Sequence, residues 1–345
     1  MSTNHNWVGR FVWTLAGVLA LFSFVLFNQA YRFTHFDAGG AAPTGPPSGL
    51  LIAKYALLGL PNPRPVDGAA PDTAYQNISL TAADGTHLAA WYVPVAQPHG
   101  TVALFHGYHS ERGGLATEAR YFRRLGFNTL QVDFRGSGAS EGNFTSVGYD
   151  EGQDVKAAYD WAFKQNVNQK IYLFGVSMGA VAVLRGMSQN PTMHPNGLLL
   201  ECPFASILDA SRGRLRTLHA PEEPLAHLIV FTGSLQNGFW GFNHNAVGYA
   251  RTIRVPTLLR VETEASVKGA EALSAQADIA RVYLTDTVDI VEKAGKDAIG
   301  SMTEGDEQRL LTMGLKRFTK AELLNVRDAR RRIAAVVIEA NEYAF

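Results

Sequence analysis

The chain has 345 residues, of which 46% are hydrophobic and 18% are charged. This composition is typical of a globular protein with a large buried core and excludes an intrinsically disordered chain. The 31 lysine and arginine residues balance 31 aspartate and glutamate residues, so the net charge gives no reason to expect nucleic acid as a partner. Cys202 is the only cysteine, which excludes an intramolecular disulfide and a multi-cysteine zinc site.

An uncharged, apolar run covers residues 11–31, after a short N-terminal tail of residues 1–10. About 20 such residues cross the hydrocarbon core of a bilayer. A cleaved signal peptide is the alternative, but cleavage after Ala30 would leave Asn28 at a position where a small residue is preferred. The run therefore favours an uncleaved, single-pass transmembrane signal anchor.

The charges that flank this run favour one orientation. The amino terminus and Arg10 precede it, whereas Arg32 follows it, which favours a cytoplasmic N-terminus and a folded domain outside the cytoplasm. Residues 37–65 are expected to form a linker and a short apolar segment, because they begin with a glycine- and proline-rich stretch. The apolar residues at 50–60 could lie on the membrane or pack on the folded domain.

An α/β domain is expected from residue 76 to residue 345. A β-hairpin opens it, because ISLTA at 78–82 and HLAAWYVPV flank the turn residues Ala83-Asp84-Gly85. Strands are then expected at 102–106, 128–134, 170–176 and 198–204, and helices near 114–125, near 149–165 and from 178. This alternation predicts βαβ units and a mostly parallel central sheet with helices on both faces.

Residues 205–250 interrupt the alternation and contain the aromatic- and glycine-rich run FTGSLQNGFWGF. They are interpreted either as a small cap inserted over the carboxyl edge of the sheet or as a pair of ordinary packing helices. Strands at 255–261 and 280–286, then helices near 304–314 and 318–338, complete the predicted elements.

The string Gly175-Val176-Ser177-Met178-Gly179 follows the strand-like run KIYLFGV and precedes a helical stretch. A serine at such a strand-to-helix turn is held on strained backbone, with its hydroxyl above the sheet. The glycines avoid Cβ atoms that would crowd the turn, and the helix that follows directs its positive end at the site. The pattern predicts Ser177 as a nucleophile.

A second segment, Phe105-His106-Gly107-Tyr108, lies at the end of the strand expected at 102–106. The backbone N–H of Tyr108 is placed to pair with the N–H of Met178 in an oxyanion hole. His106 is interpreted as a side chain that shapes this loop by hydrogen bonding, not as a catalytic base.

The glycine-rich turn that starts at Asp133 does not indicate a phosphate site, because it lacks the Lys-Ser/Thr pair of a phosphate-binding loop. We expect Asp133 and Arg135 to pair with each other and to fix this loop beside the nucleophile.

Six segments together resemble the α/β-hydrolase superfamily, in particular its serine aminopeptidase-like and monoglyceride-lipase-like branch. They are DGTHLAAWYVP, HGYHSER, VDFRGSGASEG, LFGVSMGA, LLLECPFAS and NHNAVGYARTIRVPTLL, and they run from about residue 77 to residue 259. The resemblance implies an α/β-hydrolase fold and hydrolysis of an ester or amide through an acyl-enzyme on Ser177. It also implies that the Tyr108 and Met178 amides form the oxyanion hole, with no cofactor and no metal.

The last quarter of the chain departs from the pattern of this family. The catalytic acid is matched only by Glu264, where aspartate is usual, and a solvated surface glutamate is the alternative. The last histidine is His244, so none follows the strand at 280–286, where the family has its catalytic base. Without a base, proton transfer from Ser177 is lost, and catalysis is impaired by roughly several orders of magnitude.

His109 is the first candidate for a substitute base, because it follows the predicted oxyanion segment by one residue and catalytic groups are defined by geometry, not by chain order. Glu264 would be too far along the sheet edge to orient it well. Three further histidines are candidates from the loop or cap, although each is more typical of a surface or packing residue: His219, His227 and His244.

The composition changes near residue 257. Of the 62 charged residues, 28 lie in the final 89, which contain no proline, histidine or tryptophan. Either residues 257–345 are the degenerate tail of a fold that lost catalysis, or they do not derive from the family, as a shifted reading frame would produce.

Two functions follow from these observations. The first is a membrane-anchored serine hydrolase acting on a small-molecule or lipid-like ester or amide, with an acyl pocket lined by Phe231, Phe239, Trp240 and Phe242. The second is a non-catalytic protein of the same fold that binds a lipid or a partner at the membrane, and the missing histidine motivates it.

Overall fold

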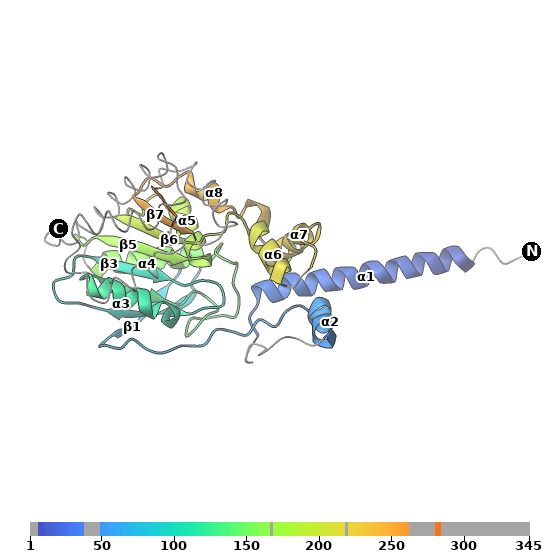
Figure 1. Cartoon of the computed structure of the whole chain (residues 1–345), viewed down its shortest axis with the longest axis horizontal. Helices are drawn as coiled ribbons and strands as arrows, with labels where there is room; N and C mark the ends of the chain where they lie inside the picture. Colours follow the sequence, from blue (N-terminus) through green and yellow to red (C-terminus); the bar gives the residue numbers. More distant parts are fainter. Residues whose placement is uncertain (1–5, 38–48, 166–167, 218–219, 262–279, 284–345) are drawn as a thin grey trace, which may run out of the picture. The chain divides into compact units, whose positions relative to one another are not determined.

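A computed structural model describes residues 6–37, 49–165, 168–217, 220–261 and 280–283 (Figure 1). The chain divides into two compact units. We call the first, Met1–Arg64 with Ser206–His244, the helical unit, and the second, Pro65–Ala205 with Asn245–Phe345, the sheet unit. Each is described by itself.

The sheet unit is built on an eight-stranded sheet, counted over the described residues, in the order β1-β2-β4-β3-β5-β6-β7-β8. Its strands are β1 (Gln76–Thr81), β2 (His87–Val93), β3 (Thr101–Phe105), β4 (Asn128–Val132), β5 (Ile171–Val176), β6 (Gly197–Glu201), β7 (Thr257–Val261) and β8 (Ala280–Tyr283). Strand β2 runs antiparallel to β1 and β4, and every pair from β4 to β8 is parallel. The predicted mostly parallel α/β sheet is confirmed.

The predicted hairpin is the pair β1 and β2. Ala82 accepts a backbone hydrogen bond from Gly85 at 3.0 Å and donates one to Thr86 at 2.9 Å. Gly85 has a φ of 91°, which a residue with a side chain rarely adopts. The turn residues therefore fix the register of the first two strands.

Helices pack on both faces of the sheet. The elements are η1 (Arg112–Leu115), α3 (Ala116–Arg124), α4 (Glu151–Gln165), α5 (Met178–Gln189) and α8 (Ala246–Ala250). On one face, Ala119 and Phe122 of α3 pack against alternate residues of β3 and β5, such as Val102 and Phe174. Helices α4 and α5 pack on each other and contact β3 and β5 on the other face. The central strands are buried on both sides, as their continuous apolar runs predict.

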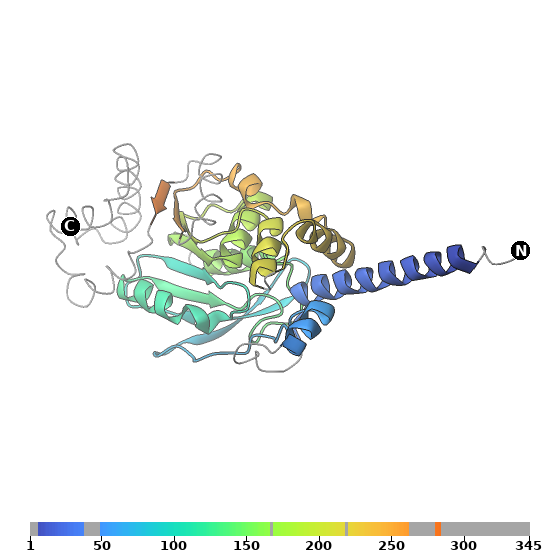
Figure 2. The same cartoon turned by 45° about the vertical axis from the view of Figure 1, so that its right-hand side comes forward.

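The helical unit contains α1 (Asn6–Thr34), α2 (Gly49–Leu58), α6 (Ile207–Thr217), α7 (Leu225–Asn237) and the short turn η2 (Gly241–Asn243). Within it, α1 contacts α2 and α7, and α6 contacts α7. Figures 1 and 2 show α2 beside the C-terminal end of the long α1 helix. A small core joins these helices, with Leu26 and Ala30 from α1, Leu215 from α6, and Ala226 and Ile229 from α7.

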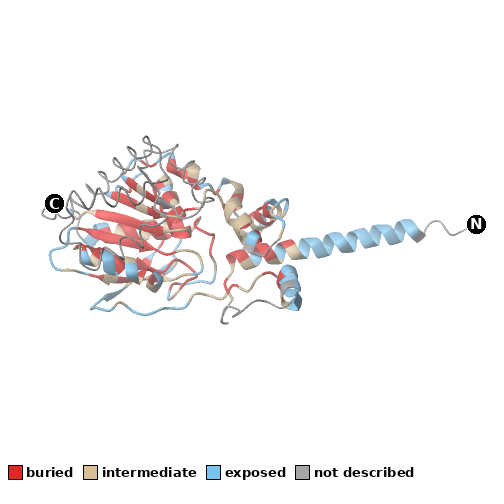
Figure 3. Cartoon of the chain, viewed as in Figure 1, coloured by how far each residue is buried: buried red, intermediate tan, exposed pale blue. Residues whose placement is uncertain are grey.

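Helix α1 includes the apolar run predicted to cross a membrane. Its stretch Trp7–Thr34 is 28 residues long, has a mean hydropathy of 2.0 and is 6% buried at its most apolar part. A helix of that length spans about 42 Å, more than the hydrocarbon core of roughly 30 Å. Figure 3 shows α1 exposed over most of its length and buried only near its C-terminal end.

The two ends of the predicted linker region are tied to each other. Asp37 accepts from the Asn62 amide at 3.1 Å, and the Asn62 side chain donates to the His35 carbonyl at 2.8 Å. Asn62 is fully buried. Asp37 and Asn62 therefore lie side by side within the helical unit, whose first segment ends at Arg64.

Other predicted elements fall in different places. Residues 206–244 of the segment interpreted as a cap belong to the helical unit, and a cap over the sheet stays a prediction. The helices expected near 304–314 and 318–338 lie outside the described residues.

Candidate active site

Ser177 lies at the sharp turn between β5 and α5. Its φ is 52° and its ψ is −114°, a conformation that costs a residue with a side chain roughly 1 to 3 kcal/mol. Its backbone N–H donates to the Glu201 carbonyl of β6 at 2.7 Å, and its carbonyl accepts from Val181 at 3.2 Å. The end of the strand and the first turn of the helix thus hold the serine on strained backbone.

The glycines around Ser177 are required by close backbone packing. A Cβ at Gly179 would lie 2.2 Å from the Phe105 carbonyl oxygen, and one at Gly175 would lie 2.7 Å from the Ala180 nitrogen. Real Cβ atoms do not come this close to backbone atoms. The spacing of glycines in the sequence motif is therefore explained by the approach of α5 to the end of β3.

The loop after β3 faces the serine, as its sequence position predicted. A Cβ at Gly107 would lie 3.5 Å from the Ser177 Cβ, which is an ordinary contact. Met178 is the first residue of α5, so its N–H is one of those that has no partner within the helix. Tyr108 is half-buried in the facing loop. An oxyanion hole formed by these two amides stays a prediction.

His106 is a structural residue of this loop. Its side chain is 1% exposed. Its Nδ1 lies 2.8 Å from the Gly107 carbonyl, and its Nε2 accepts from the Phe134 amide at 3.1 Å. These contacts require a neutral imidazole with its proton on Nδ1, and burial lowers the pKa of His106 to about 4. The interpretation that His106 shapes the loop by hydrogen bonding is confirmed.

His109 is exposed, has a φ of 60° and places its ring edge-on to Tyr108, with ring centroids 4.6 Å apart. Its role as a substitute base stays a prediction. His219 and Glu264 lie outside the described residues.

The two remaining candidate histidines belong to the helical unit. His227 is exposed and its Nδ1 lies 2.5 Å from a carboxylate oxygen of Glu223. His244 is fully buried and its ring contacts that of Phe239, with centroids 6.4 Å apart. Both contacts fit the surface and packing roles considered for these residues.

The predicted pair between Asp133 and Arg135 is wrong. Asp133 accepts from the Arg112 amide at 2.7 Å and from the Ala139 amide at 3.0 Å, and it pairs with the Arg112 guanidinium at 3.3 Å. The alternation of a strand, which places residues two apart on the same side, ends with β4 at Val132. The chain then turns, and the two side chains leave in different directions.

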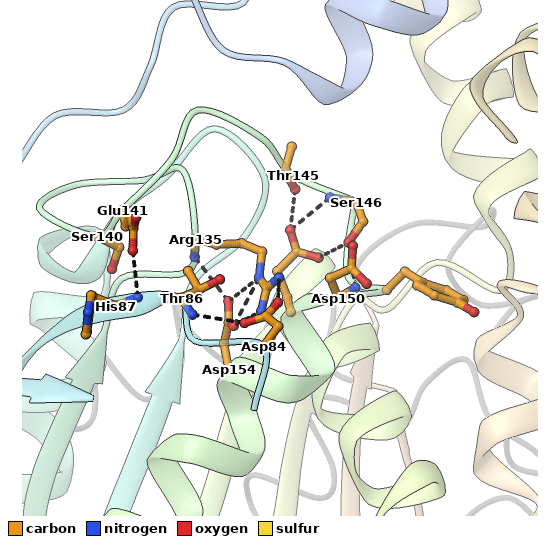
Figure 4. Close-up of polar contacts among 12 residues, drawn as sticks. Asp84, Thr86, His87, Arg135, Ser140, Glu141, Thr145, Ser146, Asp150 and Asp154 are labelled. Atoms are coloured by element: carbon orange, nitrogen blue, oxygen red, sulfur yellow. Dashed lines mark hydrogen bonds and ion pairs between the residues drawn. The ribbon is translucent and has the colours of Figure 1, made fainter. Parts of the chain in front are cut away.

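Arg135 instead pairs with Asp154 of α4, with its Nη2 2.6 Å from the carboxylate, and with Asp84 of the hairpin turn at 2.7 Å (Figure 4). Asp154 is fully buried. Next to this pair, the buried Glu151 accepts from the hydroxyls of Thr145 and Ser146 at 2.6 and 2.7 Å. This network connects the first hairpin, the loop after β4 and the start of α4.

The same network reaches the turn between β5 and α5 that holds Ser177, which we call the elbow. The Thr145 hydroxyl lies 3.5 Å from the sulfur of Met178, and a Cβ at Gly148 would lie 3.2 Å from the Met178 carbonyl. Glu151 and Asp154 were not identified from the sequence, because acidic residues in the first turn of a helix are usually solvated. No local pattern distinguishes a buried pair from a solvated one.

Three carboxylates, those of Asp67, Glu111 and Asp133, have oxygen atoms within 4.8 Å of one another. The Arg112 guanidinium pairs with two of them, Asp67 at 2.8 Å and Asp133 at 3.3 Å. Burial raises the pKa of Asp133 to about 7. A cationic side chain therefore already balances charge in this cluster, which is better described as an ion-pair network than as a metal site.

The aromatic residues proposed to line an acyl pocket lie in the helical unit. Phe231 is 44% exposed and Trp240 is 49% exposed. Their rings meet edge-on with centroids 6.1 Å apart, and Trp240 also contacts Phe242 at 5.2 Å. An acyl pocket at these residues stays a prediction.

With this fold and geometry in view, comparisons with known proteins give consistent matches. Residues 96–229 match the model of the serine aminopeptidase S33 family. The YfhR protein of Salmonella typhimurium is 32% identical over 126 residues, which cover 34% of this chain and 42% of that protein. The α/β-hydrolase domain-containing protein WAV2 of Arabidopsis thaliana is 31% identical over 166 residues, which cover 46% of this chain and 52% of that protein.

A further relative is the lysophosphatidylserine lipase ABHD12 of Danio rerio, 31% identical over 131 residues that cover 36% of this chain and 33% of that protein. Among solved structures, an esterase of Pyrococcus furiosus superposes with a TM-score of 0.51 at 24% identity and covers 69% of this chain and 94% of its own. These matches support the α/β-hydrolase superfamily for the matched part of the chain, and the solved structure shows the same fold. The chain spans about half or less of the length of these sequence relatives.

The C-terminal part matches a different family. Residues 255–317 match the model of the acyl-CoA dehydrogenase C-terminal domain. A probable acyl-CoA dehydrogenase of Bacillus subtilis is 27% identical over 86 residues, which cover 25% of this chain and 14% of that protein. This similarity favours the interpretation that the C-terminal part does not derive from the α/β-hydrolase superfamily. It also argues against a shifted reading frame, which has no reason to resemble a protein family.

Proposed function

We propose that this chain is a membrane-anchored serine hydrolase that cleaves an ester or amide bond through an acyl-enzyme on Ser177. One observation carries the proposal: Ser177 occupies the strained turn between β5 and α5 with the His106–Tyr108 loop against it. Strain of this kind is retained where the surrounding structure forces it, and it is common at catalytic residues. The substrate is a small-molecule or lipid-like ester or amide with an apolar acyl part.

In the proposed reaction, the Ser177 hydroxyl oxygen attacks the substrate carbonyl carbon and its proton passes to a base. The carbonyl oxygen gains the negative charge and accepts hydrogen bonds from the Tyr108 and Met178 amides, aided by the positive end of α5. Collapse of this intermediate breaks the bond to the leaving group, which takes the proton from the base. Water then hydrolyses the acyl-enzyme by the same steps and restores the Ser177 hydroxyl.

The proposed base is His109, the exposed histidine of the loop that borders the serine. A serine–histidine pair without a well-placed acid is slower than a full triad, because nothing fixes the orientation of the imidazole. Glu264 is the proposed acid, in a supporting role. We expect His109→Ala to abolish esterase activity as thoroughly as Ser177→Ala, and Glu264→Gln to cost less.

The membrane anchor of the proposal is α1. The buried C-terminal end of α1 supports a helix that is not cleaved off as a signal peptide, because Leu26 and Ala30 belong to the core of the helical unit. Cleavage after Ala30 would remove both from that core. We propose a single-pass protein with the hydrolase domain outside the cytoplasm. Alkaline carbonate extraction of membranes tests the anchor, since release of the full-length protein into the soluble fraction contradicts it.

A fluorophosphonate probe tests the nucleophile, because it reacts with activated serines and leaves a covalent label. We expect the full-length wild-type protein to be labelled, Ser177→Ala to remain unlabelled, and the control Ser188→Ala to be labelled as the wild type is. Ser188 lies near the far end of α5, so its loss leaves the elbow unchanged. Equal labelling of wild type and Ser177→Ala contradicts the proposal.

A non-catalytic lipid- or partner-binding protein is the second candidate. One observation favours it: the last histidine of the sequence is His244, so none follows β8, where the resemblance places the catalytic base. Turnover of p-nitrophenyl esters decides between the two. Activity that disappears with Ser177→Ala and with His109→Ala, but survives the exposed-loop control His194→Ala, rules out the second candidate. Absence of turnover and labelling in folded protein favours it.

A further inference from the structure

The helical unit leaves large apolar side chains on its surface beyond those of α1. On α7 and the turn after it, Leu235 is 70% exposed, Trp240 49% and Phe231 44%. On α2, Leu50 is 84% exposed. Helix α7 contains no aspartate, glutamate, lysine or arginine. Exposed apolar surface of this kind marks a binding surface for a protein or a membrane.

Contacts with α1 show which way α7 runs. A Cβ at Gly233 would lie 3.8 Å from the Ala30 Cβ, and three residues later the Gln236 side chain donates to the Phe27 carbonyl at 2.9 Å. Residue numbers therefore increase along α7 while those of the neighbouring α1 residues decrease, so the two helices are antiparallel. The C-terminal end of α7 points toward the apolar run of α1, whose last residue before Asn28 is Phe27.

The N-terminal end of α2 points toward the same apolar run of α1. The Gln29 side chain donates to the carbonyls of Tyr55 and Ala56, each at 2.9 Å. A Cβ at Gly59, just after α2, would lie 2.6 Å from the Arg32 Cγ. Residue numbers therefore increase in the same direction along α2 and α1, so the two helices are parallel. The exposed Leu50, near the start of α2, lies toward the apolar run of α1.

Charged residues of the same unit gather at the opposite end. Arg32 pairs with Asp37 just after the apolar run. The N-terminal end of α7 is bordered by Glu223, which pairs with Arg212 of α6 at 2.6 Å. These charged residues of the helical unit thus lie toward the C-terminal end of α1. The exposed apolar residues Leu50, Leu235 and Trp240 lie toward the apolar run of α1. This sorting along one direction is what a helix bundle at a membrane surface requires.

We infer that the C-terminal end of α7, with Trp240, and the N-terminal end of α2 enter the headgroup region of the bilayer in which α1 is anchored. The partner of this surface is the lipid bilayer. The inference rests on the proposed anchor and extends it, because the helical unit then contacts the membrane through three helices instead of one. Trp240 fits this position, since tryptophan is enriched at membrane interfaces.

Quenching of tryptophan by brominated lipids tests the inference in the full-length protein, reconstituted in phosphatidylcholine vesicles. A Trp7→Phe/Trp13→Phe background removes the tryptophans of α1 and retains Trp91, Trp161 and Trp240. Trp240→Phe in that background supplies the matched control, because Trp91 and Trp161 belong to the sheet unit. The difference between the two proteins is the emission of Trp240.

We expect Trp240 to lose roughly half of its emission with bromine near the headgroups and less with bromine near the bilayer centre. Leu235→Asp with Leu50→Asp should reduce that loss. The difference between the wild type and the Trp7→Phe/Trp13→Phe background gives the emission of the α1 tryptophans. If these are quenched and Trp240 is not, the anchor stands and the inference is wrong.

Two other results also overturn it. If the α1 tryptophans are not quenched either, the anchor fails and the inference fails with it. If Trp240 is shielded from acrylamide but unaffected by brominated lipid, a second copy or another protein covers the surface instead of lipid.

Discussion

The sheet unit and the helical unit hold their helices by different contacts. At the elbow, backbone meets backbone: Gly175 and Gly179 leave no space for a Cβ, and the buried pair of Arg135 and Asp154 ties α4 to the loop after β4. In the helical unit, a core of five buried side chains joins α1, α6 and α7, while other apolar side chains such as Leu235 are exposed.

The difference matches the functions that we propose for the two units. A catalytic serine has to be held within a fraction of an ångström, and only close backbone packing and buried hydrogen bonds give that precision. Helices at a membrane surface have an apolar solvent beside them, so a small core is sufficient and the outward apolar side chains are not a defect. Four substitutions or pairs of substitutions test this contrast.

The largest effect is expected from a methyl group at the elbow. In Gly179→Ala the Cβ would lie 2.2 Å from the Phe105 carbonyl oxygen, so the free energy of unfolding should fall by about 4 kcal/mol or more. Gly233→Ala on α7 is the matched change in the helical unit, where the nearest atoms are 3.8 Å away. It should stabilise α7 by about 0.5 to 1 kcal/mol, because alanine favours a helix over glycine.

Chemical denaturation of both variants in detergent micelles measures these changes. A Gly179→Ala protein as stable as the wild type would show that α5 does not approach β3 as described.

The next effect comes from the two kinds of ion pair. Arg135→Gln leaves the fully buried Asp154 without its charged partner, which should cost about 3 to 5 kcal/mol. Arg212→Gln removes an exposed pair with Glu223 in the helical unit, and such pairs contribute at most about 1 kcal/mol. Thermal denaturation of the two variants compares them, and equal losses would contradict the contrast between the units.

Within the helical unit, inward and outward residues of α7 should differ. Ile229 is 6% exposed and belongs to the core, so Ile229→Ala should destabilise α7 by about 2 to 5 kcal/mol. Leu235 is 70% exposed, and Leu235→Ala should change stability by at most about 0.5 kcal/mol. Hydrogen exchange of α7 peptides in micelles measures both, and a protected α7 in Ile229→Ala would show that the core is elsewhere.

The smallest effect concerns the pH dependence of the loop beside Ser177. Burial lowers the pKa of His106 to about 4 from its ordinary 6.5, so the unfolded chain binds this proton between these values and the folded chain does not. The contribution of His106 to the free energy of unfolding is therefore fully present above pH 6.5 and is lost as the pH falls through 4. This loss is at most about 3 kcal/mol. The contribution of Asp133 to stability changes with pH in the opposite direction, because burial raises the pKa of its carboxyl to about 7.

Comparison of the wild type with His106→Asn isolates the histidine, because both proteins retain Asp133. The difference in unfolding free energy between the two should shrink as the pH is lowered from 6.5 to 4. Parallel curves over that range would show that His106 is not buried as a neutral imidazole.

Local patterns were sufficient for much of the sheet unit. The hairpin at Asp84-Gly85 follows from turn chemistry, and the alternation of apolar runs with helical stretches predicts the parallel strands from β3 to β7. The apolar run of α1 is equally local. These features depend on residues close together in the sequence, so composition and spacing reveal them.

Other features depend on residues far apart in the sequence, and only the tertiary structure decided them. Arg135 could have paired with Asp133, two residues away, but it pairs with Asp154 and Asp84 because the chain turns after β4 and brings α4 and the hairpin to it. The assignment of α6 and α7 to the same unit as α1 likewise depends on contacts across about 200 residues of chain. Sequence by itself determined which residues are apolar, strained or charged, and tertiary structure decided their partners, because a partner is set by proximity in space and by burial.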